Sequence, residues 1–254
     1  MRTIHQALTL VAVFSVSACS GIGSSTSPLP AGSSTQPNPQ TQSRVLQKHV
    51  KAGNGSYVLF GDAMLVHPGY NSPTAAQATT TGPNAFGGVD FSFPAGLTVN
   101  QLNNLATEYM FTTGTCGLGS PRFSVTVNSA SGPSIFFYLG PPPNYNTCPP
   151  NVWTNSGNLA SPTNLVDATQ LGGAFYEPYA TVQATYGNDV IYDIALVMDG
   201  PSQTAEFDNT QVNNATFTYE NADSCKDGGW KQFTSTPGPF KNQGDCVSYF
   251  NNGK

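Results

Sequence analysis

The segment that follows Gly140 carries side chains that suit sugar binding. Tyr145 and Trp153 offer flat rings that stack against the C–H face of a sugar, and Asn144 and Asn155 offer amide donors and acceptors. Consecutive prolines stiffen the start of the segment, so binding would cost little conformational entropy. This pattern predicts a ligand-binding loop. The alternative is a structured loop whose Trp153 packs on the body of the protein.

Oxygen-bearing side chains near the ends of two expected strands suit a calcium ion. Asp199 ends one apolar run, and Asp208 and Asn209 lie in the next. Calcium takes roughly six to eight oxygen ligands from carboxylates, amides and backbone carbonyls, which fits a chain with few histidines. Zinc matches less well, because no His-Glu-x-x-His motif and no clustered Cys and His ligands occur. We therefore expect structural calcium, where a metal is bound at all, at these three residues.

Catalytic groups are scarce in this sequence. His67 is the only histidine beyond the N-terminal fifty residues, and no Gly-x-Ser-x-Gly motif accompanies it, which argues against a Ser-His-Asp hydrolase. Glycoside hydrolysis needs only two carboxylates, so a carbohydrate-active hydrolase remains an alternative, with no pair assigned. Asp193 lies in an otherwise apolar run, where burial would raise its pKa. Its expected partner in a structural ion pair is Arg122, the only basic residue between Lys51 and Lys226.

The five cysteines divide into one and four. Cys19 follows an apolar leader, and the others are Cys116, Cys148, Cys225 and Cys246. An even number of cysteines in an exported chain predicts two disulfides. Three pairings are open, and the local one joins Cys116 to Cys148 and Cys225 to Cys246. Each such bridge would stabilise the fold by roughly 3–4 kcal/mol, because it restricts the unfolded chain.

Residues 1–18 have the organisation of a secretory signal peptide, with Arg2, a short apolar core and small residues at the exit. The core is too short to span a membrane. The exit sequence Val16-Ser17-Ala18-Cys19 resembles the lipobox of bacterial lipoproteins, which implies that Cys19 is lipidated and becomes the first mature residue. Residues 19–52 are rich in Ser, Thr, Pro and Gln, which predicts a disordered tether. The protein is expected in the cell envelope outside the cytoplasm, with simple secretion as the alternative.

The charge balance excludes two classes of partner. The formal charge is −5, and it becomes one unit more negative when Arg2 leaves with the leader. An acidic surface neither releases counterions from nucleic acid nor attracts anionic lipid, so membrane contact is expected only through the lipid on Cys19. Only 9% of residues are charged, so the surface is polar and largely neutral. Such a surface suits a glycan or another envelope component as partner.

Short strands between Gly-, Pro- and Asn-rich loops are predicted from about residue 55 to residue 219. Apolar and polar residues alternate in three runs, which indicates half-buried antiparallel strands: Val89–Phe93, Phe123–Val127 and Ala215–Tyr219. Two further runs are apolar on both faces and are expected to be central strands, namely Ile135–Leu139 and Val190–Met198.

One short helix is predicted after Pro178. Tyr179, Val182 and Tyr186 recur at helical spacing, and Gly187 provides a stop. A single short helix among many strands indicates a mainly β protein. The expected architecture is an antiparallel, jelly-roll-like β-sandwich that is stapled by disulfides.

Two stretches resemble known families. The run from Phe175 to Phe217 includes Ile194–Gly200 and then Ala205-Glu-Phe-Asp-Asn-Thr-Gln-Val212, and it resembles the closing third of galactose-binding-like jelly rolls. That resemblance implies the fold and, by analogy, a carbohydrate- or surface-binding role.

The tail resembles a Cys-bracketed ending of bacterial exported proteins of unknown role. The matching marks are Gly-Gly-Trp230 and Phe240-Lys-Asn-Gln-Gly-Asp-Cys246-Val. This resemblance implies no chemistry. The aromatic residues of the tail supply an apolar surface too small to fold alone. We expect the tail to dock on the sandwich, with a partner-binding knob as the alternative.

The expected organisation has four parts: a signal peptide (1–18), a lipidated cysteine with its tether (19–52), a β-sandwich (53–222) and a disulfide-closed tail (223–254). The expected function is that of a non-catalytic cell-surface lipoprotein whose sandwich binds a glycan or another envelope component. The alternatives are a hydrolase with two carboxylates and a structural or protein-interaction module.

Overall fold

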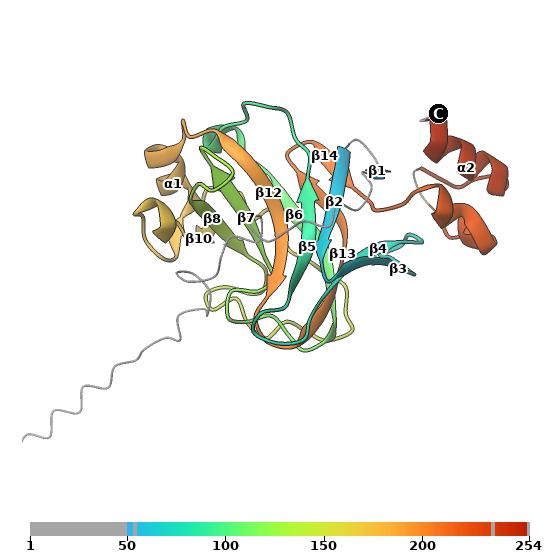
Figure 1. Ribbon diagram of the computed structural model, residues 1–254, viewed down its shortest axis with the longest axis horizontal. Coiled ribbons are helices and arrows are strands. Elements are labelled where there is room, and N and C mark those ends of the chain that lie inside the picture. The colour runs from blue at the N-terminus through green and yellow to red at the C-terminus, as the bar shows by residue number, and fades with distance from the viewer. Residues whose placement is uncertain (1–49, 53–54, 235–236, 253–254) are drawn as a thin grey trace, which may run out of the picture.

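The computed structural model describes residues 50–52, 55–234 and 237–252. The expected signal peptide, Cys19 and nearly all of the expected tether lie outside these residues. Two antiparallel sheets pack face to face over one core, and a small helical unit extends from one end (Figure 1). The predicted mainly β sandwich is confirmed.

Sheet A has six strands. Several of its neighbouring strands are far apart in the sequence, because the chain crosses between the two sheets. In spatial order they are β1 (Val50–Ala52), β2 (Gly55–Gly61), β5 (Phe86–Phe91), β12 (Ile191–Asp199), β7 (Arg122–Val127) and β8 (Ser134–Tyr138). All neighbouring pairs are antiparallel. Strand β1 falls at the end of the segment expected to be the tether.

Sheet B has the order β3 (Ala63–Val66), β4 (Ala75–Thr80), β13 (Gln203–Val212), β6 (Leu105–Thr113) and β9 (Thr154–Asn155), with β14 (Ala215–Phe217) also paired to β13. A separate pair, β10 (Leu165–Val166) and β11 (Glu177–Pro178), lies outside both sheets. Alternate residues of the two sheets fill the space between them. Phe111, Phe123, Phe207 and Phe217 are fully buried there.

The two runs that are apolar on both faces have different positions. Strand β12 lies between β5 and β7, as expected for a central strand. Strand β8 is an edge strand of sheet A, so its expected central position is wrong. It is apolar on both faces because Tyr145, Phe175 and Tyr176 cover its outer side, where they pack on Phe136 and Tyr138.

Helix α1 (Tyr179–Tyr186) lies where it was predicted, between Pro178 and Gly187, and buries Tyr179 and Val182. Helix α2 (Gln243–Asn252) was not predicted. It packs against the 3-10 segment η4 (Ala222–Lys231), and Cys225–Cys246 joins the two. Two further 3-10 turns are η2 (Val99–Gln101) and η3 (Thr169–Leu171).

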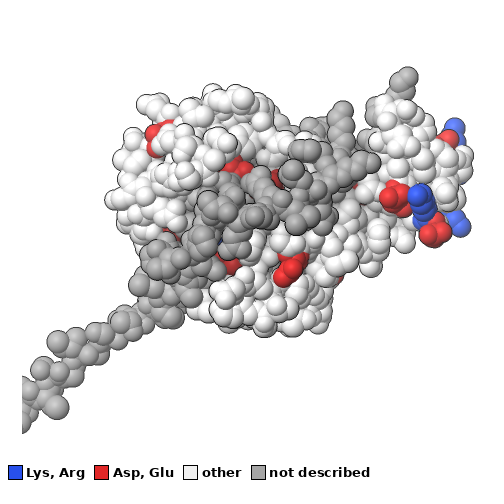
Figure 2. Space-filling view, in the orientation of Figure 1, with Lys and Arg blue, Asp and Glu red and all other residues white. Residues whose placement is uncertain are grey.

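The C-terminal unit, which we define as residues 222–252, has its own small apolar cluster. Cys225, Phe233 and Cys246 are buried in it, and Trp230 and Phe240 are among the half-buried residues around them. Figure 2 shows lysines gathered on this unit, whereas the charged side chains visible on the sandwich are carboxylates. Among the described residues, no helix is long and apolar enough to cross a membrane.

Candidate functional site

The outer face of sheet B brings together a row of polar side chains. Asp208 of β13 lies directly opposite Glu108 of β6, and Glu108 lies opposite Asn155 of β9. Residues on alternate positions share a face, so Asp208 points away from the core that Phe207 fills. The amide of Asn155 donates a 2.7 Å hydrogen bond to Glu108 Oε1, which fixes both side chains.

The loop between β3 and β4 folds over Asp208. The backbone N–H of Tyr70 and the hydroxyl of Ser72 donate to Asp208 Oδ2 at 2.8 and 2.7 Å. Gly69 is required at the tightest point, because a Cβ there would collide with Asp208 Oδ2, Ser72 Oγ and the Thr74 carbonyl oxygen. The loop therefore closes a cradle, which we define as Gly69, Tyr70, Ser72, Asp208 and Glu220.

Asp208 is fully buried in this cradle. Burial raises its pKa to about 8, and the nearby charge of Glu220 adds to the rise. Hydrogen bonds from Ser72 and from the backbone of Tyr70 and Asn209 oppose the rise only in part. The site therefore disfavours an isolated negative charge on Asp208 at neutral pH.

Glu220 is the second buried carboxylate of the cradle. Only 1% of its surface is exposed, and burial raises its pKa to about 7. Tyr219, immediately before it, adopts a positive φ of 62° and buries its ring against Tyr57, with the ring centroids 5.0 Å apart. The Tyr219 hydroxyl also forms a 2.7 Å hydrogen bond with the Thr210 hydroxyl. These contacts of Tyr219 hold the neighbouring Glu220 in its buried position.

A pair of half-buried aromatic rings borders the cradle. The centroids of Tyr70 and Trp153 are 5.6 Å apart with the rings tilted by 49°. Trp153 lies two residues before Asn155, so the ring pair stands beside the Asn155–Glu108 hydrogen bond. We call Tyr70, Glu108, Trp153 and Asn155 the Trp153 surface.

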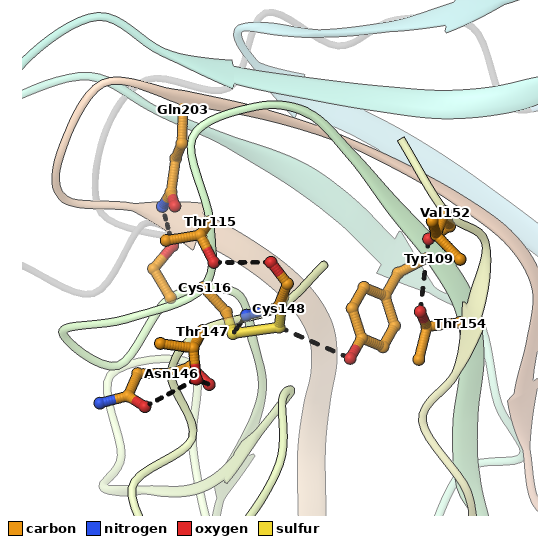
Figure 3. The surroundings of a disulfide bond; sticks show 10 residues. Tyr109, Thr115, Cys116, Asn146, Thr147, Cys148, Val152, Thr154 and Gln203 are labelled. Carbon is orange, nitrogen blue, oxygen red and sulfur yellow. Dashed lines mark hydrogen bonds between the residues drawn. A yellow bond between two sulfur atoms is a disulfide. The ribbon is translucent and has the colours of Figure 1, made fainter. Parts of the chain in front are cut away.

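The Cys116–Cys148 disulfide holds the loop that leads into the Trp153 surface. Cys148 donates its backbone N–H to Cys116 Sγ, and its carbonyl accepts from the Thr115 hydroxyl at 2.9 Å (Figure 3). The Tyr109 hydroxyl lies 3.5 Å from Cys148 Sγ (Figure 3). Further along the loop, the backbone N–H of Asn151 bonds the Phe111 carbonyl at 2.7 Å. These contacts fix the approach to Trp153 on the edge of sheet B.

The structure separates the side chains that the sequence grouped for sugar binding. Tyr145 is 4% exposed, packs on Tyr138 and Tyr176 beside sheet A, and donates its hydroxyl to the Leu165 carbonyl at 3.0 Å. Its ring therefore has no free face. Asn144 is exposed on the same loop, next to Tyr145. Trp153 and Asn155 lie instead on sheet B.

The residues expected to bind calcium are also separated. Asp199 lies on the outer face of sheet A and forms a bidentate ion pair with Arg122, at 2.6 and 2.7 Å. The Arg122 partner is thus Asp199, and the expected pairing with Asp193 is wrong. Asp208 lies on sheet B, and Asn209 follows it in a bulge with a φ of 46°.

Sequence reasoning missed five members of the two sites, namely Gly69, Tyr70, Ser72, Glu108 and Glu220. Tyr70, Glu108 and Glu220 come from distant parts of the chain, and none stands in a recognisable motif. Only the topology brings them together: β6 pairs with β13, and the loop after β3 crosses both. The cysteine pairing was easier to anticipate, and the local pairing of Cys116 with Cys148 and Cys225 with Cys246 is confirmed.

Comparison with solved structures finds chains of similar fold. The chain is similar to the family 11 carbohydrate-binding module of the cellulosomal cellulase Lic26A-Cel5E of Clostridium thermocellum, with 11% sequence identity and a TM-score of 0.37. The likeness covers 69% of this chain and 94% of that module. No family model and no curated protein matches the chain. A likeness of this size supports no conclusion about function.

Proposed function

We propose that this chain is a non-catalytic module, displayed outside the cytoplasm, that binds a neutral glycan through the Trp153 surface. The observation that carries the proposal is the ring pair of Tyr70 and Trp153, held beside the Asn155–Glu108 hydrogen bond. Aromatic faces next to fixed amide and carboxylate groups are the usual chemistry of sugar recognition, with rings for the C–H faces and polar groups for the hydroxyls.

The surroundings of this surface also favour an uncharged ligand. Between Lys51 and Lys226 the sequence has one basic residue, Arg122, which is buried in its pair with Asp199. The outer face of sheet B carries uncharged or hydrogen-bonded polar side chains, including Gln77 bonded to Glu206 at 3.3 Å and Thr79 bonded to Thr204 at 3.2 Å. No lysine or arginine with a described side chain lies on that face to attract an anionic polymer.

Two disulfides support a site of action in an oxidising compartment. We propose that the protein is held there by lipid on Cys19, so that the glycan is one of the cell envelope or its surroundings. Mass spectrometry of the mature N-terminus tests this part by itself. A diacylglyceryl-modified Cys19 is expected, and an unmodified N-terminus would restrict the proposal to a secreted protein.

The test of glycan binding uses the two tryptophans, Trp153 and Trp230, the only ones in the chain. A glycan array selects a ligand, and calorimetry then compares variants. Trp153→Ala is expected to weaken binding about tenfold or more, because aromatic anchors dominate such interfaces. Trp153→Phe should keep part of the affinity, and Trp230→Ala, in the C-terminal unit, should keep all of it.

Two outcomes would contradict the proposal. Unchanged affinity in Trp153→Ala would place the glycan site elsewhere on the chain. Release of reducing sugar from the selected polymer would instead favour the hydrolase alternative. The geometry disfavours that alternative, because Asp208 and Glu220, two carboxylates whose pKa burial raises, are both buried out of reach of a polymer.

A further inference from the structure

The buried carboxylate of Glu220 lacks the partners that a buried charge needs. Neither of its oxygens has a well-formed hydrogen bond within the described residues, although the hydroxyls of Ser72 and Thr218 lie close enough to oppose part of its rise in pKa. An unsatisfied carboxylate inside a protein costs free energy unless a proton or a cation joins it. Glu220 therefore points to a bound species.

Among the residues whose side chains the structure describes, no cation is available to fill that role. Arg122 belongs to sheet A and is already bonded through both its terminal nitrogens to Asp199. The described lysines of the C-terminal unit are exposed, and the one that forms an ion pair, Lys226, bonds Asp223. A second carboxylate, Asp208, accepts a hydrogen bond from the Ser72 hydroxyl, which also lies close to Glu220. Two carboxylates thus lie close together, and no described basic side chain offsets their charge.

Further oxygen atoms line the same place. Asp208 Oδ2, Ser72 Oγ and the Thr74 carbonyl oxygen all surround the spot where a Cβ on residue 69 would stand. Ser72 Oγ lies within hydrogen-bond distance of both of the others, at 2.7 and 3.2 Å. The donor set is all oxygen, and among the described residues no His, Cys, Asp or Glu cluster of three or more could hold a metal by itself. This chemistry fits calcium, which combines carboxylates with hydroxyls and carbonyls, and does not fit zinc.

We propose that Asp208 and Glu220 bind one Ca²⁺ ion, and that this ion fastens the C-terminal unit to the sandwich. Both carboxylates would be ligands, with Ser72 Oγ and the Thr74 carbonyl as neighbouring oxygens. Asp199, expected to be a calcium ligand from the sequence, is excluded because it neutralises Arg122. Glu220 takes its place.

The link to the C-terminal unit follows from the chain path. Asn221, directly after Glu220, caps η4 by accepting from the backbone N–H groups of Asp223 and Ser224. The Ser224 hydroxyl bonds Thr74 at 2.7 Å, on the loop that closes the cradle. An ion that draws Glu220 and the loop together therefore also holds the start of η4 in place.

The test is a calcium titration of the mature, disulfide-bonded protein. Calorimetric melts are compared in EDTA, in CaCl₂ and in MgCl₂ at one pH. Calcium at a hundredfold excess over its dissociation constant is expected to raise the melting temperature by roughly 5–10 °C. Magnesium should raise it less, because it requires a tight octahedral set of ligands. Hydrogen exchange of residues 218–224 should slow in calcium.

The variant Glu220→Gln separates the ion from a merely structural role. It keeps the shape of the side chain and removes the charge, so its melting temperature in EDTA should equal or exceed that of the parent protein. Its response to calcium should be lost, and Asp208→Asn should behave in the same way. The matched control is Glu206→Gln, a half-buried carboxylate two residues away on the outer face of the same strand, which should respond like the parent.

The proposal is overturned by any of three results. The first is a melting temperature that calcium does not change in the parent protein. The second is a Glu220→Gln variant that keeps the calcium response, which would place the ion elsewhere. The third is a calcium response without slower exchange at residues 218–224, which would remove the link to the C-terminal unit. None of these measurements uses a glycan, so the outcome is independent of the proposed binding function.

Discussion

The most deeply buried charges of sheet A are satisfied by one another. Arg122 and Asp199 lie side by side at the same end of β7 and β12, with side chains 7% and 3% exposed. Arg122 also donates to the Gly119 carbonyl at 2.9 Å, and its guanidinium lies 4.9 Å from the centre of the Phe136 ring. Burial alone would lower the Arg122 pKa, but Asp199, together with Tyr138 and Asp167, more than offsets that effect. The guanidinium is therefore held in place by hydrogen bonds to Asp199 and Gly119.

Removal of one partner should be strongly destabilising. Asp199→Asn leaves Arg122 as an uncompensated buried charge, and the expected loss is about 3–5 kcal/mol in the free energy of unfolding. Urea unfolding followed by circular dichroism measures it. The double variant Arg122→Met with Asp199→Asn should lose less than the single one, because no buried charge remains. A single variant within about 1 kcal/mol of the parent would contradict this account.

Individual residues show where sequence reasoning could and could not reach. Trp153 was predicted from its type, because an aromatic ring among amides on a stiff segment suits sugar stacking, and its binding role stays a prediction. The partner of Arg122 was missed because Asp193 and Asp199 lie on the same strand. Only the register of β12 against β7 decides that Val197, two residues from Asp199, lies opposite Arg122, whereas Asp193 lies opposite Thr126.

At the scale of elements, the pattern of apolar residues predicted β5, β7, β8, β12 and β14, but it identified neither the other strands nor the neighbours of any strand. Strand β7 was expected to be half-buried, yet Ser124 and Thr126 on its outer face are also buried. Thr126 bonds Ser134 of β8 at 3.0 Å, so hydroxyl pairs make that face compatible with burial. Helix α2 was missed because Gly244 and Asp245 weaken the helical signal, and the helix depends on the disulfide and on contact with η4.

The two disulfides should differ in what they stabilise. Cys116–Cys148 closes a separation of 32 residues and joins the core of the sandwich. Its replacement by two serines should lower the stability of the main transition by about 3–4 kcal/mol on the chain-entropy model. It should also weaken glycan affinity, because the loop that presents Trp153 loses its anchor. Calorimetric melts and glycan titrations of the Cys116→Ser, Cys148→Ser variant measure both effects.

The matched control is the second bridge. Cys225–Cys246 closes a separation of 21 residues inside the C-terminal unit, whose apolar cluster is separate from the sandwich core. The variant Cys225→Ser, Cys246→Ser should lose order in α2 and η4 while the sandwich melts near its usual temperature. Equal losses in the main transition for both variants would show that the two clusters form one cooperative unit.

At the scale of the whole molecule, charge and packing divide the chain in the same place. Residues 53–222 contain one basic residue, Arg122, and it is buried. The C-terminal unit carries the exposed lysines Lys226, Lys231 and Lys241 (Figure 2). The boundary between the two patterns falls at Glu220–Ser224, the segment that the proposed ion would fasten. The sandwich is thus poor in basic side chains, whereas the small C-terminal unit exposes several lysines.

This division predicts that the sandwich folds without most of its appendage. A chain that ends at Ser224 keeps Asp208, Glu220 and the Ser224–Thr74 hydrogen bond, and it loses only a cluster that packs on itself. Its circular dichroism should retain the β signal, and its melting temperature in calcium should stay within a few degrees of the full chain, because each lost kcal/mol shifts it by only about 2–4 °C. A chain that ends at Tyr219 lacks Glu220 and should lose the calcium response while remaining folded. Aggregation or unfolding of the chain that ends at Ser224 would show instead that the sandwich needs the C-terminal unit in order to fold. The division by charge and packing would then not be a boundary between independently stable parts.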